Sequence, residues 1–319
     1  VMANFYGQYV GFGADGTGGV SGYVFQGSAY GYHYAGYKGS APAAQQNVID
    51  KFSFTSDADA TDVGDATLAR HGLSGSHSST YGYAAGGTAA SASNIIDKVS
   101  FSADGNATDV GDILVAKKWG AGCSSSTFGY MSGGEDDSGK QDVIQKYSFT
   151  SDGNSTDVAN LTTVRSRSDN SSSSTHGYSA GGRNGNPVDI IEKFTFASDS
   201  DATDVGNLLA ATKEGCGGVN STTHGYHCQG YAGPLQNVIE KYTFASDNNS
   251  TDVGDTIGTG DFPTGSSSTT HGYNMGGETS SSSPRNIIEK FTFASDADSV
   301  DIANLTRTSV GGARGGIQV

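Results

Sequence analysis

Residues 286–301 read NIIEKFTFASDADSVD, and nearly the same string stands at residues 189–204 (DIIEKFTFASDSDATD) and 237–252 (NVIEKYTFASDNNSTD). The string is part of a cassette that opens with a Gly-Tyr pair and occurs six times, at intervals of 47 to 51 residues. Short β-rich segments repeating with a period near 50 predict the blades of a β-propeller rather than a helical solenoid. One blade cannot bury its own faces, so we expect an all-β fold in which the blades close into one ring. The tyrosines of the six pairs are Tyr32, Tyr83, Tyr130, Tyr178, Tyr226 and Tyr273.

The two ends of the chain decide between six and seven four-stranded blades. The tail, residues 307–319, matches the inner strand that precedes a Gly-Tyr strand, and the segment Gly22–Gln26 competes for the same place. If the N-terminal segment takes it, the tail would join Asn4–Phe12 in a partial seventh blade. We favour six blades, with residues 1–27 joining or preceding the ring and residues 28–319 forming the propeller.

Composition and charge exclude several classes of partner. Only 34% of the 319 residues are hydrophobic and 48 are glycine, a composition that favours disorder, but 16 tyrosines and 14 phenylalanines recur at fixed points and can supply a core between blades. The net charge of −15 leaves no basic face for general nucleic-acid binding. No apolar run approaches the roughly 18 residues of a membrane span. We therefore expect neither a nucleic-acid partner nor membrane insertion.

The string also carries a lysine in every repeat, directly after an acidic residue or a glutamine. Adjacent residues of a strand point to opposite faces, so the lysine of one blade could meet the acid of the next. We predict such a ladder between blades, and the alternative is a set of solvated charges near the rim. The pairs are Asp50-Lys51, Asp97-Lys98, Gln145-Lys146, Glu192-Lys193, Glu240-Lys241 and Glu289-Lys290.

Three cysteines are too few for a disulfide framework. Cys216 and Cys228 flank a predicted hairpin and could pair, whereas Cys123 stands alone. We favour free thiols over a Cys216–Cys228 bridge.

A turn rich in acids follows the lysine strand in all six repeats, with the pattern D-x-[DN]-x-x-D. Alternating oxygen ligands resemble a Ca²⁺ loop, but the glycine and the distant glutamate of an EF-hand are missing. Asp and Asn side chains also hydrogen-bond the backbone of tight turns, and we favour that interpretation over weak cation sites. Candidate Ca²⁺ ligands are Asp57, Asp59, Asp62, Asp199, Asp201, Asp204, Asp296, Asp298 and Asp301.

Motifs typical of catalysis do not occur. His176, His224 and His271 occupy a repeat position that holds tyrosine or phenylalanine elsewhere, which favours ring packing over metal binding. The chain has no HExxH, no G-x-S-x-G, no P-loop and no sialidase Asp-box. We therefore predict no catalytic residues, no enzymatic activity and no cofactor other than the Ca²⁺ alternative.

A partner would contact the face that carries the connections between strands 2 and 3 of a blade, because these loops differ in length and charge among the repeats while the acidic turns do not. Exposed tyrosines could stack on sugars, and Tyr37 and Tyr231 stand where a second glycine is expected. The candidate partner-binding residues are Tyr37, Lys38, Glu135, Asp136, Asp137, Lys140, Arg183, Asn184, Tyr231, Glu278 and Arg285.

The order of elements resembles the kelch repeat over residues 28–312: a strand that ends in Gly-Gly, an aromatic-rich strand, an outer strand, and an Arg or Lys opening the next inner strand. The glycine pairs are Gly86-Gly87, Gly133-Gly134, Gly181-Gly182 and Gly276-Gly277. The usual outer-strand tryptophan is missing, since the single tryptophan is Trp119.

The residue pattern of the cassette, in residues 286–296 and 106–112, is similar to that of Ser/Gly-rich propeller proteins of marine and cyanobacterial phage virions. This resemblance implies an extracellular, non-enzymatic virion component, such as a tail fibre or a capsid or tail decoration. Its partners would be a host surface glycan or protein, or neighbouring virion subunits, and assembly as a homo-oligomer stays open. The alternatives are a secreted carbohydrate-active propeller enzyme and an intracellular kelch-type interaction scaffold.

Overall fold

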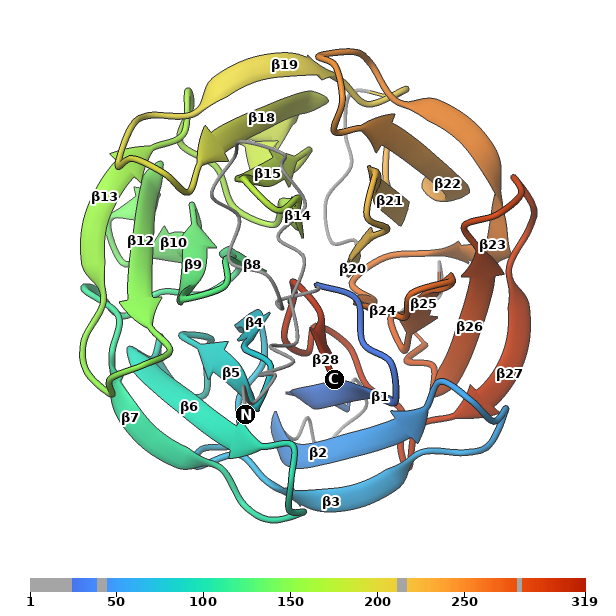
Figure 1. The fold of residues 1–319 in the computed structure, drawn as a ribbon, viewed down its shortest axis with the longest axis horizontal. Helices are drawn as coiled ribbons and strands as arrows, with labels where there is room; N and C mark the ends of the chain where they lie inside the picture. Colours follow the sequence, from blue (N-terminus) through green and yellow to red (C-terminus); the bar gives the residue numbers. More distant parts are fainter. Residues whose placement is uncertain (1–24, 39–44, 211–216, 280–282) are drawn as a thin grey trace, which may run out of the picture.

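The chain forms a β-propeller of six blades, each a four-stranded antiparallel sheet, arranged around a central axis (Figure 1). The structure is a computed structural model that describes residues 25–38, 45–210, 217–279 and 283–319. The all-β fold and the six blades predicted from the repeat are therefore confirmed. No helix among these residues is long and apolar enough to cross a membrane.

The first three blades run from the axis outward as follows. Blade 1 contains β28 (Ile317–Gln318), β1 (Tyr30–Tyr37), β2 (Gln45–Ser53) and β3 (Thr61–Asp65). Blade 2 contains β4 (Ser74–His77), β5 (Tyr81–Ala85), β6 (Ile95–Ser100) and β7 (Thr108–Asp112). Blade 3 contains β8 (Ala121–Ser124), β9 (Phe128–Ser132), β12 (Val143–Ser148) and β13 (Thr156–Asn160).

The other three blades repeat this order. Blade 4 contains β14 (Asp169–Ser172), β15 (His176–Ala180), β18 (Ile190–Thr195) and β19 (Thr203–Asn207). Blade 5 contains β20 (Gly217–Asn220), β21 (His224–Tyr231), β22 (Leu235–Thr243) and β23 (Thr251–Gly260). Blade 6 contains β24 (Thr264–Ser267), β25 (His271–Met275), β26 (Ile287–Thr292) and β27 (Val300–Asn304).

Two short hairpins extend the loops of blades 3 and 4. The first consists of β10 (Glu135–Asp136) and β11 (Gly139–Lys140), and the second of β16 (Arg183–Asn184) and β17 (Asn186–Pro187).

The C-terminal strand closes the ring. Ile317 and Gln318 pair with Tyr32 and Gly31 of β1, so the end of the chain supplies the inner strand of the first blade (Figure 1). Of the competing segment Gly22–Gln26, only Phe25 and Gln26 are described, and the carbonyl of Phe25 accepts a hydrogen bond from Gln318. The partner segment imagined for a seventh blade, Asn4–Phe12, lies outside the described residues.

Aromatic side chains form the core between blades. Tyr130 of blade 3 stacks on Phe196 at the end of the third strand of blade 4, with ring centroids 5.0 Å apart, and contacts Phe194 at 5.5 Å. The last blade meets the first in the same way, because Tyr273 stacks on Phe54 at 4.8 Å. The aromatic seams are therefore continuous around a closed ring. The remaining stacked pairs are Tyr32–Phe101, Tyr83–Phe149, Tyr178–Phe244 and Tyr226–Phe293.

The third strand alternates between the two neighbouring blades, as its sequence predicted. Phe194 of β18 packs with Tyr130 of the preceding blade, whereas Ile191 packs with Tyr242 of the following blade. Both faces of the strand are thus buried by other blades.

Inner strands approach each other so closely that some positions accept only glycine. A Cβ atom built on Gly122 of β8 would lie 2.0 Å from the carbonyl oxygen of Gly75 in β4. Because real carbon atoms stay at about 3.5 Å or more from such neighbours, the glycine sets how tightly the ring closes around its axis.

In two blades, the two left-handed residues that end strand 2 stand one position earlier in the chain than the sequence suggested. Ala35 (φ 59°) and Gln229 (φ 61°) take the left-handed place of the first glycine, and Gly36 and Gly230 take the place of the second. Tyr37 and Tyr231 therefore follow the pair instead of replacing its second member. The sequence did not reveal this, because a left-handed backbone usually indicates glycine, although other residues can adopt it at some cost.

Candidate functional site

The first acid of each acidic turn joins two neighbouring blades. Lys51 of blade 1 binds Asp104 in the turn of blade 2 at 2.5 Å, and Lys290 of blade 6 binds Asp57 of blade 1 at 2.6 Å. A lysine ladder between blades therefore exists, but its acidic partner is this aspartate and not the residue before the lysine. The other four pairs are Lys98–Asp152, Lys146–Asp199, Lys193–Asp247 and Lys241–Asp296.

The second and third acids of the turn bind backbone. Asn154 accepts a hydrogen bond from the backbone N–H of Asp112 in the preceding blade, and Asp59 accepts one from Asn304 across the ring closure. Asp62 accepts from the N–H of Gly64, two residues further on, as in an Asx turn. The same Asx bond forms at Asp109, Asp204 and Asp252.

The predicted Ca²⁺ ligands therefore point to different protein groups. Asp199 binds a lysine, Asp201 the backbone of Asn160, and Asp204 its own turn. In the ranges that the structure covers, no three His, Cys, Asp or Glu side chains come together in a way that could hold a metal ion. Among these three, only Asp204 forms the bond within its own turn that the turn interpretation predicted, whereas Asp199 and Asp201 join neighbouring blades. The same repeat positions in blades 1 and 6 hold Asp57, Asp59, Asp62, Asp296, Asp298 and Asp301.

The residue before each lysine is fully buried. It binds the segment that enters its blade from the preceding one. Glu192 accepts hydrogen bonds from the N–H and hydroxyl of Thr162 and pairs with Arg165 at 3.0 Å. Burial without water disfavours charge, so desolvation raises the pKa of the equivalent Glu289 and lowers that of Arg165. These acids support the frame and do not take part in the lysine ladder. The other carboxylate pairs are Asp97–Arg70, Asp50–Arg307 and Glu289–Arg285.

The predicted partner-binding residues lie on one face of the ring, which we call the loop face: the 2–3 loops and the 4–1 connections. They belong to different blades and do not converge on one site. Lys38 is exposed in blade 1, Tyr231 is 40% exposed at the end of β21, and Asp137 is exposed between β10 and β11. Also in the two small hairpins are Glu135, Asp136, Lys140, Arg183 and Asn184.

Three of these candidates have structural roles. Arg285 is largely buried and donates to the carbonyl of Ile257 and to Gln229, so it braces blades 5 and 6. The backbone of Glu278 pairs with that of Asp261.

The third is Tyr37, which is half-buried with its ring 5.3 Å from that of His71. It is therefore a weaker platform for a sugar than Tyr231.

Two arginines and two aromatic rings meet over the axis on the loop face. The guanidinium of Arg167 lies 5.2 Å from the ring of Trp119 and 5.1 Å from that of Phe262, and Arg314 lies 5.1 Å and 5.3 Å from the same rings. The four residues come from the segments that enter the inner strands of blades 3, 4, 6 and 1, so their contact joins these blades at the axis. Stacking of guanidinium groups on aromatic faces stabilises such clusters.

Three members of this axial cluster hold a strained backbone. Trp119, Arg167 and Phe262 have φ values of 60°, 64° and 55°, at a repeat position where Gly72 and Gly311 are also left-handed. Left-handed conformation in non-glycine residues costs on the order of 1 kcal/mol each and persists where packing imposes it. The strain is thus balanced by the stacking at the axis.

More of the exposed apolar side chains lie on the loop face than on the opposite face. Seven of the ten large hydrophobic residues that are exposed in the described chain lie there, and the other three, Tyr30, Tyr81 and Val300, lie on the opposite face. Most of them directly follow a fourth strand, at the outer edge of the ring. They are Leu68, Leu114, Val115, Val164, Leu209, Tyr231 and Ile257.

The three histidines of the shared repeat position behave as packing rings. His271 lies 6.4 Å from Tyr273 between ring centroids and binds the hydroxyl of Thr270. In the blades with an aromatic residue instead, the ring lies under a lysine, as Tyr30 does under Lys51 at 5.0 Å. The matching positions are His176 and His224.

Free thiols were favoured over a Cys216–Cys228 bridge, and Cys216 lies outside the described residues. Cys123 is a buried free cysteine, and burial raises its pKa to about 12, so the thiol is unreactive.

Sequence reasoning missed the axial cluster and the consequence of Gln145. Trp119 was noted only as the single tryptophan, although it stands at a repeat position that holds Gly72 and Gly311 in two other blades. Gln145 was noted as the one residue before a lysine that is not acidic, and this difference removes the carboxylate from one blade.

Compared with known proteins, the chain matches no family model, and no curated protein is recognisably similar to it in sequence.

Proposed function

We propose that the chain is a non-enzymatic structural or adhesive ring that docks on a protein partner through its loop face. Because the residue pattern of its repeats resembles that of phage propeller proteins, we propose further that it belongs to a virion, as a tail fibre or as a capsid or tail decoration. The partner is then a neighbouring virion subunit or a host surface protein. The kelch resemblance is part of the same proposal.

The observation that carries the proposal is the uneven distribution of exposed apolar side chains. Seven of ten lie on the loop face, around its outer edge, beside the loops that differ among the blades. These side chains are distributed over blades 1 to 5, so a protein that docks on the whole loop face would cover several of them at once. Rigid blades with variable loops can present such a surface without moving.

The other candidate functions have less support. An enzyme would need acids that converge at the axis. On the loop face, the residues that meet at the axis are Trp119, Phe262 and two arginines. A host glycan would use exposed aromatic rings, and among the described loop-face residues Tyr231 is the one large exposed ring.

Incorporation into particles tests the proposal. The protein is expressed with the parent virus, and its amount in purified virions is compared for the native chain, Leu209→Asp and Val300→Asp. The two substituted side chains are similarly exposed, at 55% and 53%, but lie on opposite faces. We expect Leu209→Asp to lower incorporation at least fivefold and Val300→Asp to leave it unchanged. Absence of the native protein from virions would refute the virion assignment, and equal incorporation of both variants would refute docking by the loop face.

A further inference from the structure

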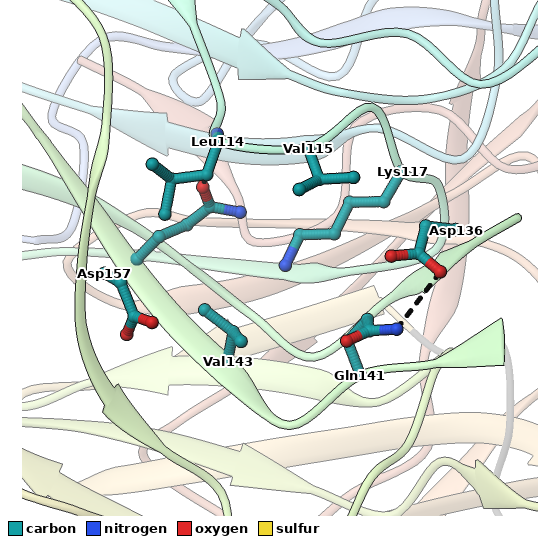
Figure 2. A pocket seen from close by; sticks show the side chains of 8 residues that line it. Leu114, Val115, Lys117, Asp136, Gln141, Val143 and Asp157 are labelled. Atoms are coloured by element: carbon teal, nitrogen blue, oxygen red, sulfur yellow. Dashed lines mark hydrogen bonds between the residues drawn. The ribbon is translucent and has the colours of Figure 1, made fainter. Parts of the chain in front are cut away.

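A small pocket opens beside blade 3, between the connection that enters β8 and the hairpin β10–β11. It has a volume of about 140 Å³. Figure 2 shows the Lys117 side chain extending into its middle, with Asp157 on one side and Gln141 and Asp136 on the other. This inference does not rest on the proposed function. The pocket shares only Leu114 and Val115 with the exposed apolar side chains of the loop face.

At this pocket, blade 3 lacks the buried ion pair of blades 2 and 4. In those blades an arginine at the repeat position of Lys117 pairs with a carboxylate, as Arg165 does with Glu192. Blade 3 has Lys117 and Gln145 instead. The Gln145 oxygen accepts from the N–H of Leu114 and the hydroxyl of Ser155, so it keeps the structural role of the carboxylate but offers no charge to the lysine.

Lys117 is only 3% exposed, yet its amino group faces the pocket and not a buried acid. Leu114, Val115 and Val143 supply apolar walls. Desolvation lowers the pKa of Lys117 to about 8, while Asp136 on β10, Asp157 on β13 and Asp142 before β12 act in the opposite direction. A lysine of this kind is nucleophilic at neutral pH, because a useful fraction of the amine is unprotonated.

We propose that Lys117 and its pocket capture a small neutral aldehyde as a Schiff base. The unprotonated Nζ adds to the carbonyl carbon, the carbinolamine loses water, and an imine remains, with no change in oxidation state. The pocket limits the carbon skeleton to a few atoms. An anionic ligand is disfavoured because two carboxylates, Asp136 and Asp157, line the same pocket.

Reductive trapping tests the inference on the whole chain. Propanal and cyanoborohydride are added at pH 7.5; the hydride reduces the imine to a stable secondary amine, and peptide mapping by mass spectrometry gives the rate at each lysine. Lys146 is the internal control, since it lies in the same blade and is held by Asp199. We expect Lys117 to react at least tenfold faster than Lys146, with half of its maximal rate near pH 8. Equal rates at the two lysines would overturn the inference.

Two comparisons separate the pocket from general reactivity. Gln145→Glu restores the acid of the other blades, and we expect it to slow Lys117 at least tenfold while Lys146 is unchanged and the melting temperature is kept. Naphthaldehyde, which exceeds the pocket, should show no preference for Lys117. An unchanged rate in Gln145→Glu, or an equal preference for naphthaldehyde, would show that the pocket and its missing carboxylate do not control the lysine.

Discussion

Replacing Gly122 by alanine should destabilise the ring far more than one methyl group usually does. The new Cβ would lie 2.0 Å from the carbonyl oxygen of Gly75 and 2.7 Å from its nitrogen. Both contacts are to backbone of the neighbouring inner strand, which cannot rotate away as a side chain could. The two strands would have to separate by more than 1 Å to reach ordinary contact distances of about 3.5 Å.

The cost follows from what that separation disturbs. Overpacking of a core costs about 1–3 kcal/mol, and here the strands lie in a closed ring, so the displacement is passed on to other blades. We expect a loss of at least about 3 kcal/mol in the free energy of unfolding. For a chain of this size that corresponds to a fall of roughly 5 °C in the melting temperature.

Urea unfolding followed by circular dichroism measures this loss, with Gly105→Ala as the matched control. A Cβ on Gly105 meets no heavy atom within 4 Å, so that variant should stay within about 0.5 kcal/mol of the native chain. If Gly122→Ala were as stable as Gly105→Ala, the inner strands would not be packed as tightly as described, and the account of the glycine-rich axis would be wrong.

Three further predictions follow from the ring. Deleting residues 317–319 removes β28 and exposes the edge of β1, so the protein should lose cooperative unfolding or aggregate in size-exclusion chromatography; a monomer with an unchanged melting temperature would contradict closure by this strand. Lys290→Met removes one exposed ion pair across the closure, and thermal unfolding should show a loss of at most about 1 kcal/mol, because such pairs are screened by water; a much larger loss would mean that the charge pairs, and not the aromatic seams, hold the ring. Burial lowers the pKa of His33 to about 3 and that of His77 to about 4, so the unfolded chain binds protons that the folded chain does not. The stability from these groups is complete above pH 6.5 and declines below it, by up to about 2 kcal/mol per histidine at pH 5. The urea midpoint should fall over this range in the native protein and fall less in His33→Gln, and equal pH dependence of the two would contradict the assignment.

Calorimetry with Ca²⁺ addresses the acidic turns. We expect no heat and no change in melting temperature, because the turn carboxylates already bind lysines and backbone N–H groups. A saturable heat that disappears in Asp201→Ala would restore the cation interpretation.

Local pattern was sufficient for much of the architecture. The period and the fixed aromatic positions predicted blades with an aromatic core between neighbours, and the structure has them so. The turn aspartates were also assigned to backbone hydrogen bonds for a local reason, since Asp62 reaches an N–H only two residues away.

Pairing between blades was predicted only in kind. The sequence indicated that Lys51 would meet an acid of the next blade, but several acids per repeat were available, and we selected the wrong one. The burial of each acid decides the choice. The acid before the lysine is buried beside the connection that enters its own blade, whereas Asp104, in the turn of the adjacent blade, lies within reach of Lys51.

The sequence by itself determined the sixfold repeat and its strands, because each depends on residues that are close together in the chain or recur at a fixed spacing. Only the tertiary structure decided that the C-terminus closes the first blade, that Trp119, Phe262, Arg167 and Arg314 meet at the axis, and that one missing carboxylate leaves Lys117 facing a pocket. These features join residues that are distant in the chain, up to 285 positions in the pair of Tyr32 with Ile317, and closing the ring is what brings them within reach of one another.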